Sequence, residues 1–204
     1  MKATVKRRRS PRATPSSRPG RPRDPRFDER LLEATLRLLA REGYAGASLE
    51  AVAKEAGVSK PAIYRRWSSK AELATAALAH LQAGDGPAAS GDARTDLVNL
   101  MASFRRLLLR PNGLAMIGTL LVEERENPML LRLFRERVVA ARRLQVRALL
   151  EKAVAQRRLR RDVDVDAATN ALIGSFYARY ISGEPIGTDW PERVVALVWD
   201  GLAR

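Results

Sequence analysis

The stretch "SLEAVAKEAGVSKPAIYRRWSSKAEL", residues 48–73, decides the fold of this chain of 204 residues. It contains two short helical patterns, one on each side of Gly57-Val58-Ser59. Ser48 predicts the N-cap of a first helix that runs through Ala56. Gly57 can adopt the positive φ that a tight turn between helices requires, and Pro61 is tolerated in the first turn of the second helix, which Ser59 can cap. The stretch therefore predicts two helices joined by a short turn.

Helical patterns continue on both sides of this pair. Upstream, leucines recur at three- and four-residue spacing from residue 25 onward, and Gly43 is typical of a left-handed C-cap. Downstream, we expect the second helix of the pair to end near Trp67. Ser69 and Glu72 then have the spacing of a capping box, which predicts a fourth helix through about Ala83.

The composition limits the class of protein. Hydrophobic residues make up 46% and charged residues 29%, as in an ordinary globular protein. The chain has no cysteine and a single histidine, His80, so we expect no thiolate or multi-histidine metal site and no cofactor. Because no apolar run approaches the ~18 residues of a membrane span and no signal peptide is evident, we expect a cytoplasmic protein.

A net charge of +14 indicates an anionic partner, and nucleic acid, an anionic membrane and acidic protein surfaces are the candidates. Residues 1–26 carry much of this charge, because they contain ten Lys or Arg and one Asp. They also hold five of the eleven prolines and no aromatic residue, which predicts a disordered basic arm. Its "RPGRPRD", residues 18–24, resembles short hooks that enter an A·T-rich minor groove, and a solvated tail with non-specific phosphate affinity is the alternative.

The remainder of the chain also has helical periodicity, and no segment alternates with period two. "AGDGPAASGD", residues 83–92, predicts a boundary or loop. Beyond it we expect helices over about 97–108, 114–121, 128–158, 164–182 and 191–203, and the long one carries an apolar stripe that includes Leu144. We therefore predict an all-α fold of about nine helices, with a helix-turn-helix domain at residues 27–83 and a second helical domain at 92–204.

The cations around the second helix of the pair suggest what it contacts. A helix-turn-helix presents its second helix to the DNA major groove, while nearby cations and hydroxyls bind phosphates. Lys60, Ala62, Arg65 and Arg66 are the residues that we expect to face outward. Any amphipathic helix pair in a basic protein would share part of this pattern. An ordinary helix pair that does not bind DNA therefore remains the alternative.

The segment from Phe27 to about Leu78 resembles the DNA-binding module of the tetracycline-repressor (TetR) family. The likeness lies in a helix followed by Gly-Tyr, a Ser-capped short helix, "AGVS", Ile-Tyr and a later Lys-x-x-Leu. It implies base contacts from Lys60, Ala62 and Arg66, with Ala62 limited to a methyl contact, and phosphate contacts from Ser48, Tyr64 and Lys70. Arg65 could serve either purpose. The full predicted set of DNA contacts is Ser48, Lys60, Pro61, Ala62, Tyr64, Arg65, Arg66 and Lys70.

The C-terminal helices are expected to form a dimer, since one recognition helix contacts too few bases for tight specific binding. The resemblance implies that the last two helices form a four-helix bundle across a two-fold axis. The predicted interface residues are Val165, Ala168, Leu172, Ile173, Phe176, Val195, Val198 and Trp199. The alternative, that such residues face the core of their own chain, remains open for about half of them.

The middle helices are expected to enclose a pocket for a small, partly apolar effector, because bundle interiors commonly bind ligands. The predicted lining is Met101, Phe104, Leu108, Met116, Leu120, Phe134, Val138, Tyr177 and Tyr180, each of which could also be ordinary core. The leading hypothesis is thus a ligand-responsive repressor that binds a palindromic operator as a homodimer, in the cytoplasm and associated with the nucleoid. A non-specific nucleoid protein is the alternative, and the lack of a recognisable catalytic cluster argues against an enzyme.

Overall fold

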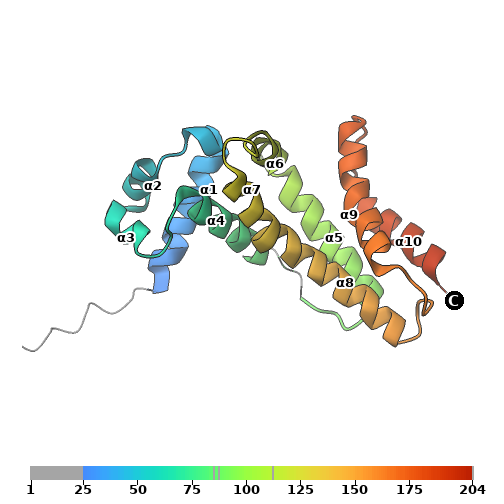
Figure 1. The fold of residues 1–204 in the computed structure, drawn as a ribbon. Coiled ribbons are helices and arrows are strands. Elements are labelled where there is room, and N and C mark those ends of the chain that lie inside the picture. The colour runs from blue at the N-terminus through green and yellow to red at the C-terminus, as the bar shows by residue number, and fades with distance from the viewer. Residues whose placement is uncertain (1–24, 85, 87, 112, 204) are drawn as a thin grey trace, which may run out of the picture.

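The computed structural model describes residues 25–84, 86, 88–111 and 113–203. Within these ranges the chain forms nine helices, if α7, η1 and α8 are counted as one, and no strand, so the predicted all-α fold is confirmed. Figure 1 shows an elongated arrangement with α1–α4 at one end and α9–α10 at the other. The elements are α1 (Pro25–Gly46), α2 (Leu49–Ala56), α3 (Lys60–Tyr64), α4 (Lys70–Gly84), α5 (Ala93–Leu109), α6 (Gly113–Val122), α7 (Pro128–Phe134), the π-helical turn η1 (Arg135–Val139), α8 (Ala140–Ala155), α9 (Val165–Ile181) and α10 (Trp190–Leu202).

Local signals set the ends of the N-terminal helices. Gly43 has φ 68° and ψ 179°, so its φ is positive as expected but its backbone is extended rather than left-handed helical. The α3 helix is shorter than predicted because it ends at Tyr64 instead of near Trp67. Most of the predicted basic arm, residues 1–24, lies outside the described residues, and its contact with DNA stays a prediction.

The N-terminal helices share one hydrophobic core with part of the C-terminal region. Buried leucines of α1 and α4 pack with Ile63 of α3 and with Leu120, Leu130 and Leu131 from α6 and α7. The α4 helix therefore packs against α1 and also against α7 and η1. The domain boundary expected at residues 83–92 stays a prediction. Because α4 packs on α1 and also on α7 and η1, it connects the N-terminal helices to the C-terminal ones.

A second core holds the C-terminal helices together. It is built from α5, α8, α9 and α10, and its centre is an edge-to-face set of rings in which Phe176 lies 5.4 Å from both Phe104 and Trp190. No helix of the described residues is long and apolar enough to cross a membrane.

The π-helical turn η1 changes which face of the following helix is buried. Its backbone hydrogen bond is donated by the Ala140 N–H to the Arg135 carbonyl, so this turn contains one residue more than an α-helical turn. The extra residue moves the buried stripe of α8 one position along the chain, to Arg142, Val146 and Leu150. The predicted stripe through Leu144 is therefore wrong, and this side chain is 64% exposed.

Candidate nucleic-acid interface and ligand cavity

The turn between α2 and α3 has the geometry that the sequence predicts. The Ala51 N–H donates to Ser48 Oγ at 3.0 Å and caps α2. Gly57 has φ 66° and ψ 37°, a left-handed conformation, and the next N–H, that of Val58, donates to the Ala53 carbonyl at 2.9 Å. Ser59 occupies the N-cap position of α3, although its side chain makes no capping hydrogen bond. The two helices are thus fixed by local backbone contacts.

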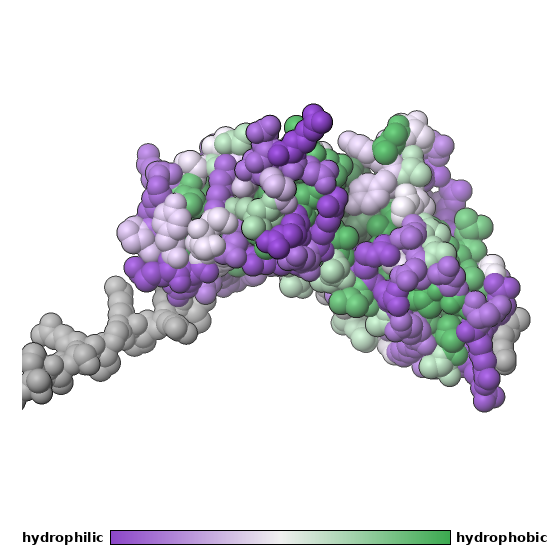
Figure 2. Space-filling model, in the orientation of Figure 1, coloured by the Kyte–Doolittle hydropathy of each residue, from purple (hydrophilic) through white to green (hydrophobic). Residues whose placement is uncertain are grey.

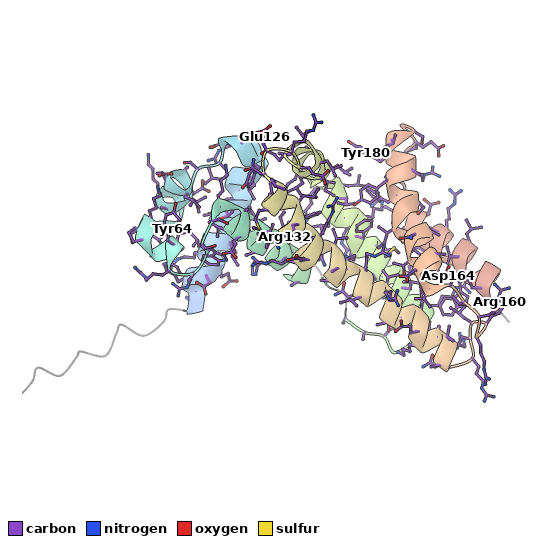
Figure 3. The ribbon with its side chains drawn as sticks, in the orientation of Figure 1. Tyr64, Glu126, Arg132, Arg160, Asp164 and Tyr180 are labelled. Atoms are coloured by element: carbon purple, nitrogen blue, oxygen red, sulfur yellow. The ribbon has the colours of Figure 1, made fainter. Side chains whose placement is uncertain are left out.

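Four of the predicted DNA contacts are exposed on and just after α3, namely Pro61, Tyr64, Arg65 and Arg66. Tyr64 is 49% exposed and lies at the outer end of the molecule, as Figure 3 shows. Arg65 is exposed, and its guanidinium has no ion-pair partner within the part of the chain that the structure describes. Ser48 and Pro61 are exposed as well. This surface combines a cation, a phenol and a hydroxyl, which are groups that bind phosphate and base edges.

Lys60 is engaged within its own chain. Its ammonium forms an ion pair with Glu50 of α2, and this hydrogen bond lowers the pKa of Glu50 and raises that of Lys60. Water screens exposed ion pairs of this kind, so Lys60 can exchange Glu50 for a DNA group at small cost.

Arg66 lies against α1 in this structure. Its Nε is 2.5 Å from Asp28 Oδ1, and its Cζ is 4.2 Å from the ring centroid of Phe27. The guanidinium therefore links the end of α3 to the start of α1, and base reading by Arg66 stays a prediction that requires these contacts to be exchanged.

Lys70 is likewise held at the start of α4. Its Nζ lies 4.3 Å from the ring centroid of Tyr44 and donates to the Ala45 carbonyl at 3.3 Å. Burial lowers the pKa of Lys70, an effect that Glu123 opposes, and burial also raises the pKa of Tyr44. The phosphate contact expected of Lys70 stays a prediction.

Ala62 does not face outward as the sequence suggested. It is only 6% exposed, because the five residues of α3 turn Ala62 and Ile63 toward the inside. Its methyl group has almost no surface for a thymine contact, so the expected outward orientation of this residue is wrong.

A cavity of about 140 Å³ lies at the junction of the two parts of the molecule. Figure 2 shows apolar surface where the N-terminal helices meet the C-terminal ones. The wall is formed by residues of α4 through α9, which are Leu78, Leu81, Gln82, Phe104, Leu107, Leu108, Gly113, Met116, Ile117, Leu120, Phe134, Val138, Val139, Arg142, Arg143, Ile173 and Tyr177. The cavity thus touches α4 of the DNA-binding end and the C-terminal core at once.

Most of the lining predicted from the sequence does border this cavity, namely Phe104, Leu108, Met116, Leu120, Phe134, Val138 and Tyr177. Two predicted residues do not. Met101 is fully buried in the C-terminal core, and Tyr180 is 51% exposed near the end of α9, where Figure 3 labels it.

Sequence reasoning missed three polar residues of the wall, Gln82, Arg142 and Arg143. Arg142 is buried because η1 rotates α8, an effect that periodicity alone does not reveal. Gln82 of α4 is also buried, and its Nε2 donates to the Val138 carbonyl at 3.3 Å. Gln82 therefore connects α4 to η1 directly beside the cavity.

The predicted dimer residues are largely occupied within one chain. Leu172, Phe176 and Val195 are fully buried, and Ala168 and Trp199 are buried too, while Val165, Ile173 and Val198 are half-buried against the same core. The buried five have no surface to offer a second copy, so their assignment to the interface is wrong. The sequence pattern thus identified the inner face of α9 and α10, which packs on the core of its own chain.

Comparison with known proteins agrees with this geometry. Residues 31–77 match the family model of bacterial regulatory proteins of the tetR family, and residues 87–198 match the tetracyclin repressor-like C-terminal domain. The chain belongs to the TetR family. This TetR-family chain is thus a DNA-binding transcriptional regulator and not an enzyme, and the resemblance read from residues 27–78 is confirmed.

Individual relatives support the assignment to the TetR family. The HTH-type transcriptional regulator YdeS of Bacillus subtilis is 28% identical over 188 residues, 91% of this chain and 94% of YdeS. The DNA-binding transcriptional repressor TetR of Mycobacteroides abscessus is 47% identical over 78 residues, 37% of this chain and 41% of that protein. Among solved structures, the TetR family transcription regulator SCO0332 has a TM-score of 0.72 and 29% identity, covering 88% of this chain and 100% of that one.

Proposed function

We propose that the protein is a homodimeric repressor that binds a palindromic operator and is released by a small effector. The observation that carries this proposal is the cavity, because its wall includes α4, which packs directly on α1 of the DNA-binding end. A ligand bound there can have a higher affinity for one position of α4 than for another. It would then weaken DNA binding by the same factor by which DNA weakens ligand binding.

The operator contacts that we propose begin with the exposed groups Ser48, Pro61, Tyr64 and Arg65. Lys60 joins them by exchanging Glu50 for DNA. Arg66 and Lys70 act first by fixing α3 and α4 against α1, which holds the recognition helix in place. Residues 27–83 serve as the DNA-binding domain, and residues 1–26 add affinity that depends on salt. Such a protein acts on the chromosome, in the cytoplasm.

Dimerisation is assigned to the outer face of α9 and α10. Exposed small or apolar residues recur on this face at helical spacing, and residues of both helices, among them Ala178 and Leu197, line a groove. Ile181 is 83% exposed and Leu197 is 77% exposed. The exposed set is Ala171, Gly174, Ala178, Ile181, Leu197 and Gly201. Burial of this face by a second copy would remove apolar surface from water.

The route from cavity to DNA runs through η1. At one end of α4, Gln82 donates to the Val138 carbonyl, and at the other Arg137 forms an ion pair of 3.3 Å with Glu72. A ligand that displaces Val138 or Phe134 therefore shifts α4, which packs on α7 and η1. Because α4 also packs on α1, the whole DNA-binding end moves with it.

A gel-shift competition tests the proposal. An operator is first selected from random DNA by repeated binding, and its affinity is then compared with that of a scrambled sequence of equal length. We expect a ratio of ~10³ or more, as for specific regulators. A ratio of tenfold or less would favour the alternative, a non-specific nucleoid-type protein. A specific complex that no small molecule releases would refute the effector part alone.

A further inference from the structure

The first turn of α2 carries a carboxylate close to the recognition helix. Glu50 follows the N-cap Ser48 by two residues, and its side chain is 64% exposed. It forms an ion pair with Lys60, the first residue of α3, whose Nζ lies 5.8 Å from the ring centroid of Tyr64. Figure 1 shows α2 and α3 at the end of the molecule opposite α10, and Figure 3 labels Tyr64 there. The carboxylate of Glu50 thus lies among the proposed DNA contacts.

A second acid of the same helix has a different environment. Glu55 accepts a hydrogen bond from Arg37 Nε at 2.8 Å and another from Arg41 Nη2 at 3.2 Å, and both arginines belong to α1. Glu55 therefore fixes α2 against α1, whereas Glu50 pairs with the recognition helix α3. Only the environment of Glu50 changes when Lys60 moves from this carboxylate to DNA.

Loss of its partner leaves Glu50 with a negative charge near the DNA phosphates. Like charges repel each other, so an uncompensated carboxylate at this surface opposes binding to any sequence. A hydrogen-bond donor on a base edge offsets this penalty, because hydrogen bonds to charged groups are strong. The donors in the major groove are the N6 amino group of adenine and the N4 amino group of cytosine. Glu50 therefore favours sequences that place one of these amino groups beside it.

A G·C pair matches the two side chains together. A lysine ammonium binds the O6 and N7 acceptors of guanine, and a glutamate accepts from the N4 amino group of cytosine. Guanine O6 and cytosine N4 are hydrogen-bonded to each other within the base pair, as Lys60 and Glu50 are in the free protein, so the spacing of the two groups agrees. In an A·T pair the N6 donor of adenine lies beside its N7 acceptor and repels an ammonium placed there. The ion pair is thus complementary to one G·C pair.

We propose that Glu50 is a specificity-determining residue, which accepts a hydrogen bond from the N4 amino group of a cytosine while Lys60 binds O6 and N7 of the guanine paired with it. The inference rests on the proposed operator binding and identifies one base pair of each half-site as G·C. Any other base pair at this position leaves the charge of Glu50 without its donor, so the same residue also disfavours competing sequences.

Binding measurements on substituted operators test the proposal. An operator is selected from random DNA with the full chain, each position is changed symmetrically in both half-sites, and fluorescence anisotropy gives the Kd for the wild type, Glu50→Ala and Lys60→Met. At one G·C position the wild type should lose at least about tenfold in affinity on a change to A·T, while both variants should lose less than about threefold there and keep their preferences elsewhere. Glu50→Ala should also bind random DNA more tightly than the wild type, because a negative charge is removed.

Removal of one base group locates the contact of Glu50. The cytosine at that position is replaced by pyrimidin-2-one, an analogue that lacks the N4 amino group. The wild type should bind this operator at least about tenfold more weakly than the unmodified one, whereas Glu50→Ala should bind it less than about threefold more weakly. Equal losses for the two proteins would overturn the contact between Glu50 and cytosine.

Glu55→Ala is the matched control on α2. It removes the same charge from the same helix, but the partners of Glu55 lie on α1, so it should lower the free energy of unfolding and leave every base preference unchanged. Circular dichroism checks that all variants are folded. Loss of the same G·C preference in Glu55→Ala would show that the placement of α2 sets this preference, and would overturn the proposal.

The outcomes separate this inference from the proposed function. If Glu50→Ala raised the affinity for the operator and for every substituted site by one common factor, Glu50 would only repel DNA, and the inference would fail while operator binding stands. A selection that yields no preferred sequence would refute operator binding and the inference together.

Discussion

The exchange of Leu197 for alanine tests which face of α10 forms the dimer. Leu197 is 77% exposed in the single chain, whereas Val195, two residues earlier, is fully buried. Burial of one methylene contributes about 0.8 kcal/mol, so the three carbons that Leu197→Ala removes contribute about 2 kcal/mol in each protomer when a partner covers the exposed share. A two-fold dimer loses this twice, about 4 kcal/mol, which corresponds to a rise of up to about a thousandfold in the dimer Kd.

Sedimentation equilibrium of the purified protein measures this constant, and Val195→Ala is the matched control on the same helix. Val195→Ala should lower the free energy of unfolding by about 1–3 kcal/mol, because it leaves a cavity in the core, yet change the dimer Kd less than about threefold. If Leu197→Ala left the dimer Kd unchanged and Val195→Ala raised it, the assignment of inner and outer faces would be wrong.

Three further outcomes are expected from the DNA-binding end. Gly57→Ala should lower the free energy of unfolding by about 1–2 kcal/mol, since φ is 66° there and no atom crowds the site, while Gly118→Ala in the exposed part of α6 should raise it by about 0.5–1 kcal/mol. Equal effects in chemical denaturation would contradict the role of the turn. Arg65→Ala should weaken operator binding and reduce the slope of log affinity against log salt by about 0.9, as measured by fluorescence anisotropy, and an unchanged slope would show that Arg65 does not contact phosphate. Hydrogen bonds from Ser68 hold the pKa of Glu72 below its ordinary value of 4.5, so its contribution to stability is present above that pH and is lost as the pH falls through the lower folded-state value. Glu72→Gln should therefore remove part of the acid sensitivity of thermal unfolding below pH 4.5, and identical pH profiles would refute this.

The lining of the cavity was only partly predictable from the sequence. Apolar residues of the middle helices were correctly expected to line it, because bundle interiors collect large side chains such as Phe104 and Phe134. Arg142 was not expected there, since a charged residue on a long helix is normally solvated. The extra residue in the η1 turn decides the orientation of Arg142. Whether that residue is present depends on how α7 and α8 pack against α4 and α5.

What the sequence determined by itself is the helix-turn-helix and its family. Ser48 caps a helix by bonding an N–H three residues away, and Gly57 adopts a conformation that other residues rarely reach, so both signals act within a few residues. Only the tertiary structure decided which side of each helix is buried. Ala62 and Leu172 face inward and Leu144 and Leu197 face outward, because neighbouring helices compete for each apolar face and the local pattern does not record which neighbour lies closest.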